Sequence, residues 1–294
     1  MVSARSGFAP GVPDGANLRL RFGGDEQLIQ PRNVLITGAA SGLGLALARE
    51  AGRLGMRVAL ADINEQRGEQ ARRGLSENGV ECLFTYCDVR REQDIRNAVQ
   101  RVVRRWGQLD ILINNAGVAA AGLFEAIPAD DWDWLLDINL LGVTRGCRVA
   151  VTEMKRQGHG HIVNIASMAA LTPPPGMSAY NVAKAAVVSL SESLHGELAP
   201  LGIDVTVVCP SFFRTNLGES LRAPDPVTSA RFEKLLAHND ITADDIARDT
   251  FKAIDKKQFL VLPHADGRKA WRQKRWFPGR FAAQMQQLAR RLRR

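Results

Sequence analysis

From residue 33 onward, short apolar runs alternate with longer amphipathic segments, and this alternation limits the folds open to the chain. Seven runs have the length and composition of buried strands: 34–37, 58–61, 82–86, 111–113, 162–165, 205–209 and 259–262. Helical periodicity predicts helices near 43–54, 65–77, 91–105, 130–155, 179–199 and 243–256. Alternating buried strands and helices are typical of a parallel sheet covered on both faces. We therefore predict one doubly wound α/β domain over residues 32–262.

The two ends of the chain differ from this domain. Residues 1–31 are rich in Gly, Pro, Ser and Arg and are predicted to be a flexible extension, although Leu18, Leu20 and Phe22 alternate as in a short strand. The tail, residues 263–294, carries ten Lys or Arg and one acid, a surplus of +9. Because the net charge of the chain is +8, the first 262 residues carry −1. The high pI therefore does not indicate a nucleic-acid-binding domain, and we expect no nucleic-acid partner.

Cysteine usage and hydropathy narrow the protein class further. The four cysteines, at positions 82, 87, 147 and 209, form no CxxC pair and no His/Cys cluster. We therefore expect reduced thiols and no metal site. No apolar run is long enough to span a bilayer, and no secretory signal follows Met1. These features predict a cytoplasmic protein, with membrane association left open by the basic tail.

Tyr180 and Lys184 are the strongest catalytic candidates. A spacing of four residues in a helical segment places both side chains on one face. The pKa of a phenol is about 10, and a neighbouring ammonium group lowers it by favouring the phenolate. We expect this pair to exchange a proton with an alcohol oxygen.

A glycine-rich turn follows the first predicted strand of the domain. It reads Thr-Gly-Ala-Ala-Ser-Gly-Leu-Gly over residues 37–44 and opens a predicted helix. Glycines let the backbone turn tightly and approach a pyrophosphate, whose charge a helix N-terminus stabilises. The spacing differs from the GxGxxG fingerprint. The predicted dinucleotide contacts are Gly38, Ser41, Gly42, Leu43 and Gly44.

Asp62 ends the second predicted strand, 18 residues after Gly44. A carboxylate there accepts hydrogen bonds from ribose hydroxyls and repels a 2′-phosphate. Ser41, directly before Gly42, is not basic, which also favours NAD over NADP. Arg67, in the next helix, is the residue that could pair with such a phosphate.

Four motifs in this order resemble the short-chain dehydrogenase/reductase family. They are the turn 37–44, Asn-Asn-Ala-Gly at 114–117, Ser167, and Tyr180 with Lys184. The resemblance covers residues 33 to 262 and implies a Rossmann-like sheet of about seven parallel strands with a nicotinamide cofactor. It also implies a homodimer or homotetramer through the helices at 130–155 and 179–199. It does not identify the substrate.

The resemblance assigns roles to further residues. Asp88 and Val89 would contact the adenine, and Asn115, Ala116 and Gly117 would line the path of the cofactor ribose. Asn139 would hold a water near the catalytic lysine.

On the catalytic side, the resemblance has Ser167 hydrogen-bond the substrate oxygen. Lys184 would lower the pKa of Tyr180 and also bind the nicotinamide ribose, so that both residues also contact the cofactor. Pro210 and Thr215 would contact the nicotinamide end. Ser211 departs from the glycine that is usual in the family at that position.

Apolar residues flank the predicted catalytic group. On one side they are Phe212, Phe213, Leu217, Leu221 and Phe232, and on the other Met168, Leu171, residues 173–175 and Met177. This lining favours an apolar alcohol or ketone, and hinge or core packing is the alternative.

The tail combines Trp271, Trp276 and Phe277 with flanking cations, and a helical apolar stripe follows Pro278. It fits packing on this subunit or a neighbour, contact with an anionic membrane surface, or a solvated tail.

We therefore expect an NAD-dependent oxidoreductase that moves a hydride between nicotinamide and an apolar secondary alcohol or ketone, with Tyr180 as the general acid/base. The alternatives are an NADP-dependent carbonyl reductase acting on acyl thioesters and a non-catalytic dinucleotide-binding regulator.

Overall fold

A computed structural model describes residues 18–22, 25–29, 31–237 and 241–293 of the chain. Its contacts divide into two units, Met1–Pro31 and Arg32–Arg294. In the first unit, β1 (Leu18–Phe22) pairs antiparallel with β2 (Asp25–Ile29). The alternating residues 18–22 therefore form a strand within the segment that was predicted to be a flexible extension. Residues 1–17 of the predicted flexible extension lie outside the described residues.

The second unit contains the predicted sheet. Its seven strands are β3 (Asn33–Thr37), β4 (Arg57–Asp62), β5 (Cys82–Tyr86), β6 (Ile111–Asn114), β7 (Gly160–Ile165), β8 (Ile203–Val208) and β9 (Leu260–Val261). They are all parallel, in the order β5-β4-β3-β6-β7-β8-β9. The predicted α/β fold is confirmed, although β9 is shorter than the apolar run at 259–262.

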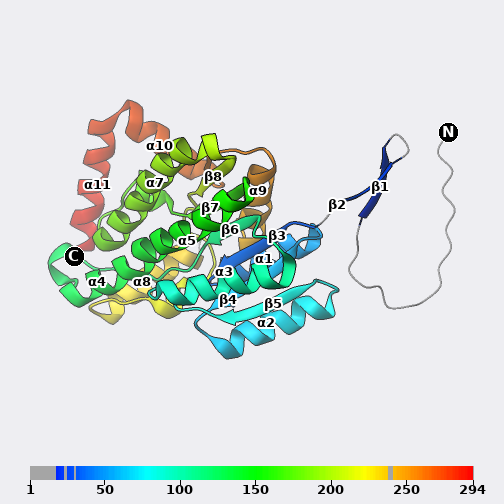
Figure 1. The fold of residues 1–294 in the computed structure, drawn as a ribbon. Coiled ribbons are helices and arrows are strands. Elements are labelled where there is room, and N and C mark those ends of the chain that lie inside the picture. The colour runs from blue at the N-terminus through cyan, green and yellow to red at the C-terminus, as the bar shows by residue number, and fades with distance from the viewer. Residues whose placement is uncertain (1–17, 23–24, 30, 238–240, 294) are drawn as a thin grey trace. The chain divides into compact units, whose positions relative to one another are not determined.

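Helices cover both faces of the sheet (Figure 1). One face packs against α3 (Glu92–Trp106), α5 (Gly142–Gln157) and α7 (Ser178–Leu198). The other packs against α1 (Gly42–Arg53), α2 (Glu65–Glu77) and α9 (Ala243–Asp255). Side chains alternate between the two faces along a strand, so a strand buried on both faces is apolar throughout.

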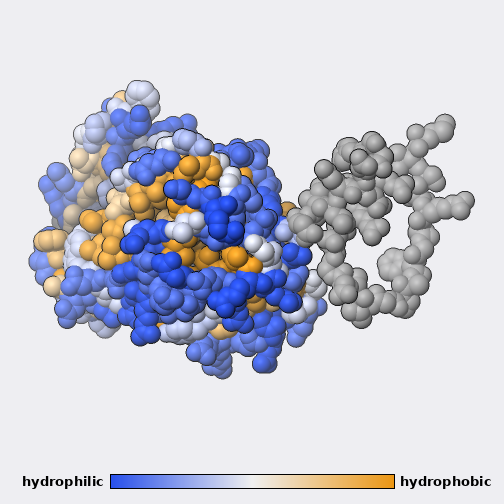
Figure 2. Space-filling model, viewed as in Figure 1, coloured by the Kyte–Doolittle hydropathy of each residue, from blue (hydrophilic) through white to orange (hydrophobic). Residues whose placement is uncertain are grey.

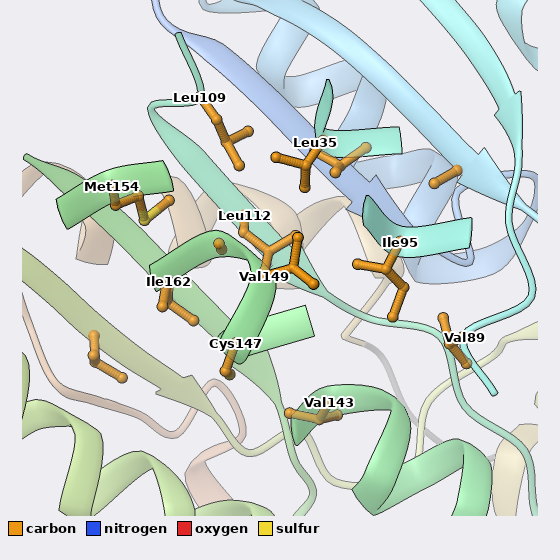
Figure 3. Close-up of a cluster of buried hydrophobic side chains, with 14 of the residues drawn as sticks. Leu35, Val89, Ile95, Leu109, Leu112, Val143, Cys147, Val149, Met154 and Ile162 are labelled. Carbon is orange, nitrogen blue, oxygen red and sulfur yellow. The ribbon is translucent and has the colours of Figure 1, made fainter. Parts of the chain in front are cut away.

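The first of these cores shows how strands and helices meet. Leu35 and Leu112 point from neighbouring strands toward Ile95 of α3 and Val149 of α5 (Figure 3). All four side chains are buried, Leu35 and Leu112 completely. Burying a Leu or Ile side chain contributes roughly 1.5–3 kcal/mol, so the sheet and its helices form a rigid support for the loops at its edge.

The helix prediction needs two changes. The helix expected near 130–155 is present but contains a π-helical turn: it consists of α4 (Ala129–Leu136), η2 (Asp137–Leu141) and α5. Between β8 and α9, where no helix was predicted, the chain forms η4 (Asn216–Ser220) and α8 (Pro226–Ala237). The remaining short elements are η1 (Phe124–Ala126), α6 (Met168–Leu171) and η3 (Ala199–Leu201).

The tail is folded. It forms α10 (Ala265–Trp276) and α11 (Pro278–Leu292), and the apolar stripe after Pro278 packs within this unit in part: Phe281 is buried, Met285 and Leu292 are half-buried, and Leu288 is exposed. A solvated tail without structure is therefore excluded for residues 265–292.

The four cysteines are free, as expected, and all except Cys82 are buried. Across the described residues, no helix is both long and apolar enough to cross a bilayer. Within the same residues, no group of three acidic, His or Cys side chains could hold a metal ion.

Candidate active site

Loops from six strands meet at the carboxyl edge of the sheet. The strand order reverses between β3 and β6, where an α/β sheet leaves a crevice for a ligand. A pocket of about 650 Å³ lies there. Every predicted site residue lines it except Asn139: Gly38, Ser41, Gly42, Leu43, Gly44, Asp62, Asp88, Val89, Asn115, Ala116, Gly117, Ser167, Tyr180, Lys184, Pro210 and Thr215.

The glycine turn has the geometry that a dinucleotide needs. Gly38 and Gly42 have φ of +64° and +51°, a region that favours glycine. A Cβ on Gly44 would lie 2.0 Å from the carbonyl oxygen of Gly38, so no side chain fits between turn and helix. Ser41, the N-cap of α1, forms no side-chain cap hydrogen bond. The first-turn N–H groups of α1 therefore suit a pyrophosphate.

Asp62 lies at the end of β4 with both carboxylate oxygens bound to the backbone. Oδ2 accepts from the Ala40 amide and Oδ1 from the Asn64 amide, each at 2.9 Å. Beside it, Arg67 Nη1 donates to Glu219 Oε2 at 2.6 Å. Glu219 was not predicted from the sequence. Its contact joins α2 to η4 across 152 positions, and no local sequence pattern indicates such a contact.

Asp88 is buried at the pocket wall and is paired. The Arg90 guanidinium donates to both oxygens of Asp88, with Nη2–Oδ2 at 2.6 Å, and holds the pKa of Asp88 below its usual value. Arg90 also lines the pocket and was not predicted. The expected contact of Asp88 with adenine stays a prediction. For this contact, the adenine amino group would have to donate a hydrogen bond to a carboxylate that already accepts hydrogen bonds from Arg90.

The Asn-Asn-Ala-Gly segment locks the end of β6 onto the glycine turn. Asn115 Nδ2 donates to the Thr37 carbonyl at 2.9 Å, and the Ala116 amide donates to Thr37 Oγ1 at 3.1 Å. Asn114 is turned inward instead, with Nδ2 donating to Asn164 Oδ1 at 2.9 Å. The segment thus has a structural part and a part that lines the pocket.

Asn139 lies in the π-helical turn and is fully buried. Its amide group pairs with the backbone of Val118, both hydrogen bonds being 2.8 Å long. A Cβ on Gly117 would lie 3.2 Å from Asn139 Oδ1 and 3.6 Å from Lys184 Nζ. The π turn therefore brings Asn139 close to Lys184 without placing it on the pocket wall.

Tyr180, Lys184 and Ser167 meet at the centre of the pocket. Lys184 Nζ lies 5.7 Å from the centre of the Tyr180 ring and donates to the Ile165 carbonyl at 2.9 Å. Ser167 is the N-cap of α6. Its Oγ accepts from the Ala169 amide at 3.1 Å.

The electrostatics of this group differ from the expectation. Burial raises the pKa of Tyr180 to about 12, and a hydrogen bond with Ser167 lowers it only in part. Burial also lowers the pKa of Lys184 to about 8. The lowering of the Tyr180 pKa that was expected from Lys184 is not seen here, because the loss of hydration decides the direction of the shift.

The segment after β8 is held from the tail. The Ser211 amide donates to Nδ1 of His264, the N-cap of α10, at 3.2 Å. Thr215 Oγ1 lies 2.8 Å from where a Cβ on Gly42 would stand, so Thr215 borders the glycine turn. The departure at Ser211 is thus accommodated by a contact from outside the predicted domain.

The apolar end of the pocket agrees in part with the sequence. Phe212, Phe213, Leu217, Phe232, Met168, Pro174 and Met177 line the pocket, whereas Leu221, Leu171, Pro173 and Pro175 do not. Trp134 of α4 and Leu236 of α8 also line it and were missed. Tertiary packing alone brings these helices to the pocket.

Comparison with known proteins agrees with this geometry. The short chain dehydrogenase family profile matches residues 32–226. A CLA biosynthesis dehydrogenase/reductase from Lactiplantibacillus plantarum is 32% identical over 79% of this chain and 88% of its own length. The probable oxidoreductase EphD of Mycobacterium tuberculosis is 31% identical over 86% of the chain, which spans 45% of EphD.

Among solved structures, a short chain dehydrogenase/reductase from Burkholderia phymatum in complex with NAD is similar, with a TM-score of 0.80 and 31% identity. The match covers 83% of this chain and 93% of that chain. Fold, pocket position and sequence similarity lead to one conclusion. The chain belongs to the short-chain dehydrogenase/reductase family.

Proposed function

We propose that this oxidoreductase is NAD-dependent and transfers a hydride between the nicotinamide and an apolar secondary alcohol or ketone, with Tyr180 as the general acid/base. One observation carries the proposal: a single pocket joins the glycine turn to Ser167, Tyr180 and Lys184. A dinucleotide held at the turn and a substrate at Tyr180 would then share one cavity.

The side chains would divide the work as follows. Bound NAD would supply the hydride acceptor or donor and, when oxidised, a positive charge. A positive charge in the pocket lowers the pKa of a buried phenol. Tyr180 would accept the hydroxyl proton in oxidation and return it to the carbonyl oxygen in reduction. Ser167 would hold the substrate oxygen, and Asn139, beside Lys184, would support proton transfer to solvent.

Charge at the nucleotide end supports NAD over NADP. Asp62 would repel a 2′-phosphate. Arg67 of α2, the cation that the sequence offers for such a phosphate, already pairs with Glu219. To bind Arg67, a 2′-phosphate would therefore have to displace the Glu219 carboxylate, and it would be repelled by the Asp62 carboxylate.

The chemistry of the other end supports an apolar substrate. The charged side chains that line the pocket are Asp62, Asp88, Arg90, Lys184 and Glu219. Aromatic and aliphatic side chains dominate the lining beyond Lys184, with Thr172, Ser211 and Ser220 as neutral polar members, and Phe212 and Phe232 meet edge to face with ring centres 6.3 Å apart. A sugar or small acid would leave its polar groups unpaired there.

We further propose a homo-oligomer. Figure 2 shows an apolar area over α5 and α7 on the face seen in Figure 1. Leu141 and Val182 are 45% and 49% exposed at these helices. A second copy could cover this face.

The test is a panel of apolar secondary alcohols and ketones with NAD(H) and NADP(H), followed by the absorbance of the reduced nicotinamide. We expect turnover with NAD(H) and a marked preference over NADP(H). Preference for NADP(H) with acyl thioesters would favour the carbonyl reductase instead. NAD binding without turnover on any member of the panel would favour a regulator.

A further inference from the structure

The α10–α11 hairpin is held firmly against the catalytic unit. Lys274 Nζ donates to the Leu171 carbonyl, the last residue of α6, at 2.6 Å. At the far end of the hairpin, Arg293 pairs with Glu125 at 2.7 Å. These two contacts, together with the buried Phe281, attach the hairpin to the rest of this unit (Figure 1).

The turn between the two helices exposes two consecutive aromatic side chains. Trp276 is 72% exposed and Phe277 is 55% exposed, whereas Phe281, one turn further along α11, is buried. Packing within the subunit therefore leaves these two rings uncovered. Large aromatic side chains left in water at a helix corner suit a surface that can bury them.

Cations surround these two rings. Arg272, Arg275 and Trp276 share one face of α10, because they are three and four residues apart. Arg280 lies over the Phe277 ring, with its guanidinium carbon 5.4 Å from the ring centre. We call Arg272, Arg275, Trp276, Phe277 and Arg280 the aromatic corner.

The positive charge of the aromatic corner is not neutralised. Within the described residues, Arg272, Arg275 and Arg280 form no ion pair with a carboxylate. The sequence from residue 267 to the end holds no acidic residue at all. The corner thus combines exposed aromatic rings with unopposed cations.

We propose that the aromatic corner docks this enzyme onto the surface of an anionic lipid bilayer. Trp and Phe rings enter the interface between headgroups and acyl chains, while Arg side chains pair with anionic headgroups. This proposal does not depend on the identity of the substrate.

Charge favours a bilayer over a second copy of the chain. In a two-fold contact through this surface, the same patch lies on both subunits. Such a contact would bring the cations of one corner against those of the other, and like charges at an interface oppose association. An anionic lipid surface has the complementary charge.

The test is co-sedimentation of the full-length protein with vesicles of phosphatidylcholine, with and without phosphatidylglycerol. We expect binding to the anionic vesicles that weakens as salt is raised. Trp276→Ser/Phe277→Ser should reduce binding to the level of the phosphatidylcholine vesicles. Arg272→Gln/Arg275→Gln should weaken it by roughly fivefold per cation, and so by more than about tenfold together.

A matched control removes two cations elsewhere. Arg101 and Arg104 are exposed on α3 and form no ion pair with a described carboxylate. Arg101→Gln/Arg104→Gln should change binding by less than about twofold. Absence of wild-type binding, or equal losses in both arginine pairs, would overturn the proposal. So would a Trp276→Ser/Phe277→Ser variant that changes the oligomeric mass but still binds the vesicles.

Discussion

At its nucleotide end the pocket is walled by residues that directly follow strands, whereas at its apolar end the walls come from α4, α6 and α8. Asp62 is the last residue of β4, and Gly38 directly follows β3. Trp134 and Phe232, by contrast, lie on α4 and α8, two helices in the connections that follow β6 and β8. The first end therefore depends on backbone conformation, and the second depends on side-chain packing between distant segments.

Because the two ends are built differently, they suit different parts of the reaction: one suits the cofactor and the other the substrate. Backbone amides and glycines suit a phosphate-linked cofactor that many proteins share. Packed aromatic side chains can change shape and size without altering the sheet. The two ends meet at Ser167, Tyr180 and Lys184, so substitutions should affect cofactor binding, substrate binding or chemistry separately.

The largest expected effect is at Tyr180, where the two ends of the pocket meet. Tyr180→Phe removes the hydroxyl that exchanges the proton and keeps the ring. We expect turnover to fall by about 10²–10⁴, with the Kd for NAD unchanged within about twofold because the ring still fills its site. Steady-state kinetics and calorimetric titration with NAD measure the two effects. Unchanged turnover would remove Tyr180 from the chemistry.

At the nucleotide end, Gly44→Ala places a methyl group against the Gly38 carbonyl, 2.0 Å away. Because the clash is with backbone, relieving it should cost at least about 1–3 kcal/mol. We expect NAD binding to weaken by about tenfold to a hundredfold.

Gly74→Ala, on α2, is the control, since nothing lies within 4 Å of the added Cβ. It should leave NAD binding unchanged and stabilise the fold slightly. Equal NAD affinities for the two variants would show that close contact at the turn is unimportant.

At the apolar end, Phe232→Leu shortens a side chain that lines the pocket and is 3% exposed. We expect KM for an apolar alcohol to rise by about tenfold, while the Kd for NAD stays constant. Val227→Ala, at an exposed position of the same helix, should change neither quantity. A shift in NAD affinity without a shift in KM would contradict the assignment of this end.

The smallest expected effect concerns the Arg67–Glu219 ion pair at the nucleotide end of the pocket. Glu219→Gln frees Arg67 from its carboxylate partner, so affinity for NADP should rise by about fivefold, as expected for one exposed charge pair. NAD affinity should hardly change. Adding Arg67→Met to that variant should abolish the gain. A gain that survives the second substitution would show that Arg67 is not the group that meets the phosphate.

The sequence predicted those features that depend on residues close together in the chain. All seven strands and the glycine turn follow from apolar runs and residue spacing, because short buried strands and tight turns leave direct patterns. The π-helical turn at Asn139 left no such pattern. The Arg67–Glu219 pair and the place of Phe232 on a pocket-lining helix depend on contacts between segments far apart in the chain. The pKa of Tyr180 could not be predicted from Lys184 alone, because burial of the phenol decides its direction.

The most direct test of hydride transfer follows one hydrogen atom. An apolar secondary alcohol that the enzyme oxidises is deuterated at its carbinol carbon and incubated with NAD⁺, and the nicotinamide product is analysed by mass spectrometry. We predict that the deuterium is transferred to the reduced nicotinamide and that the rate falls. Deuterium recovered in water, or an unlabelled nicotinamide product, would contradict direct hydride transfer in this pocket.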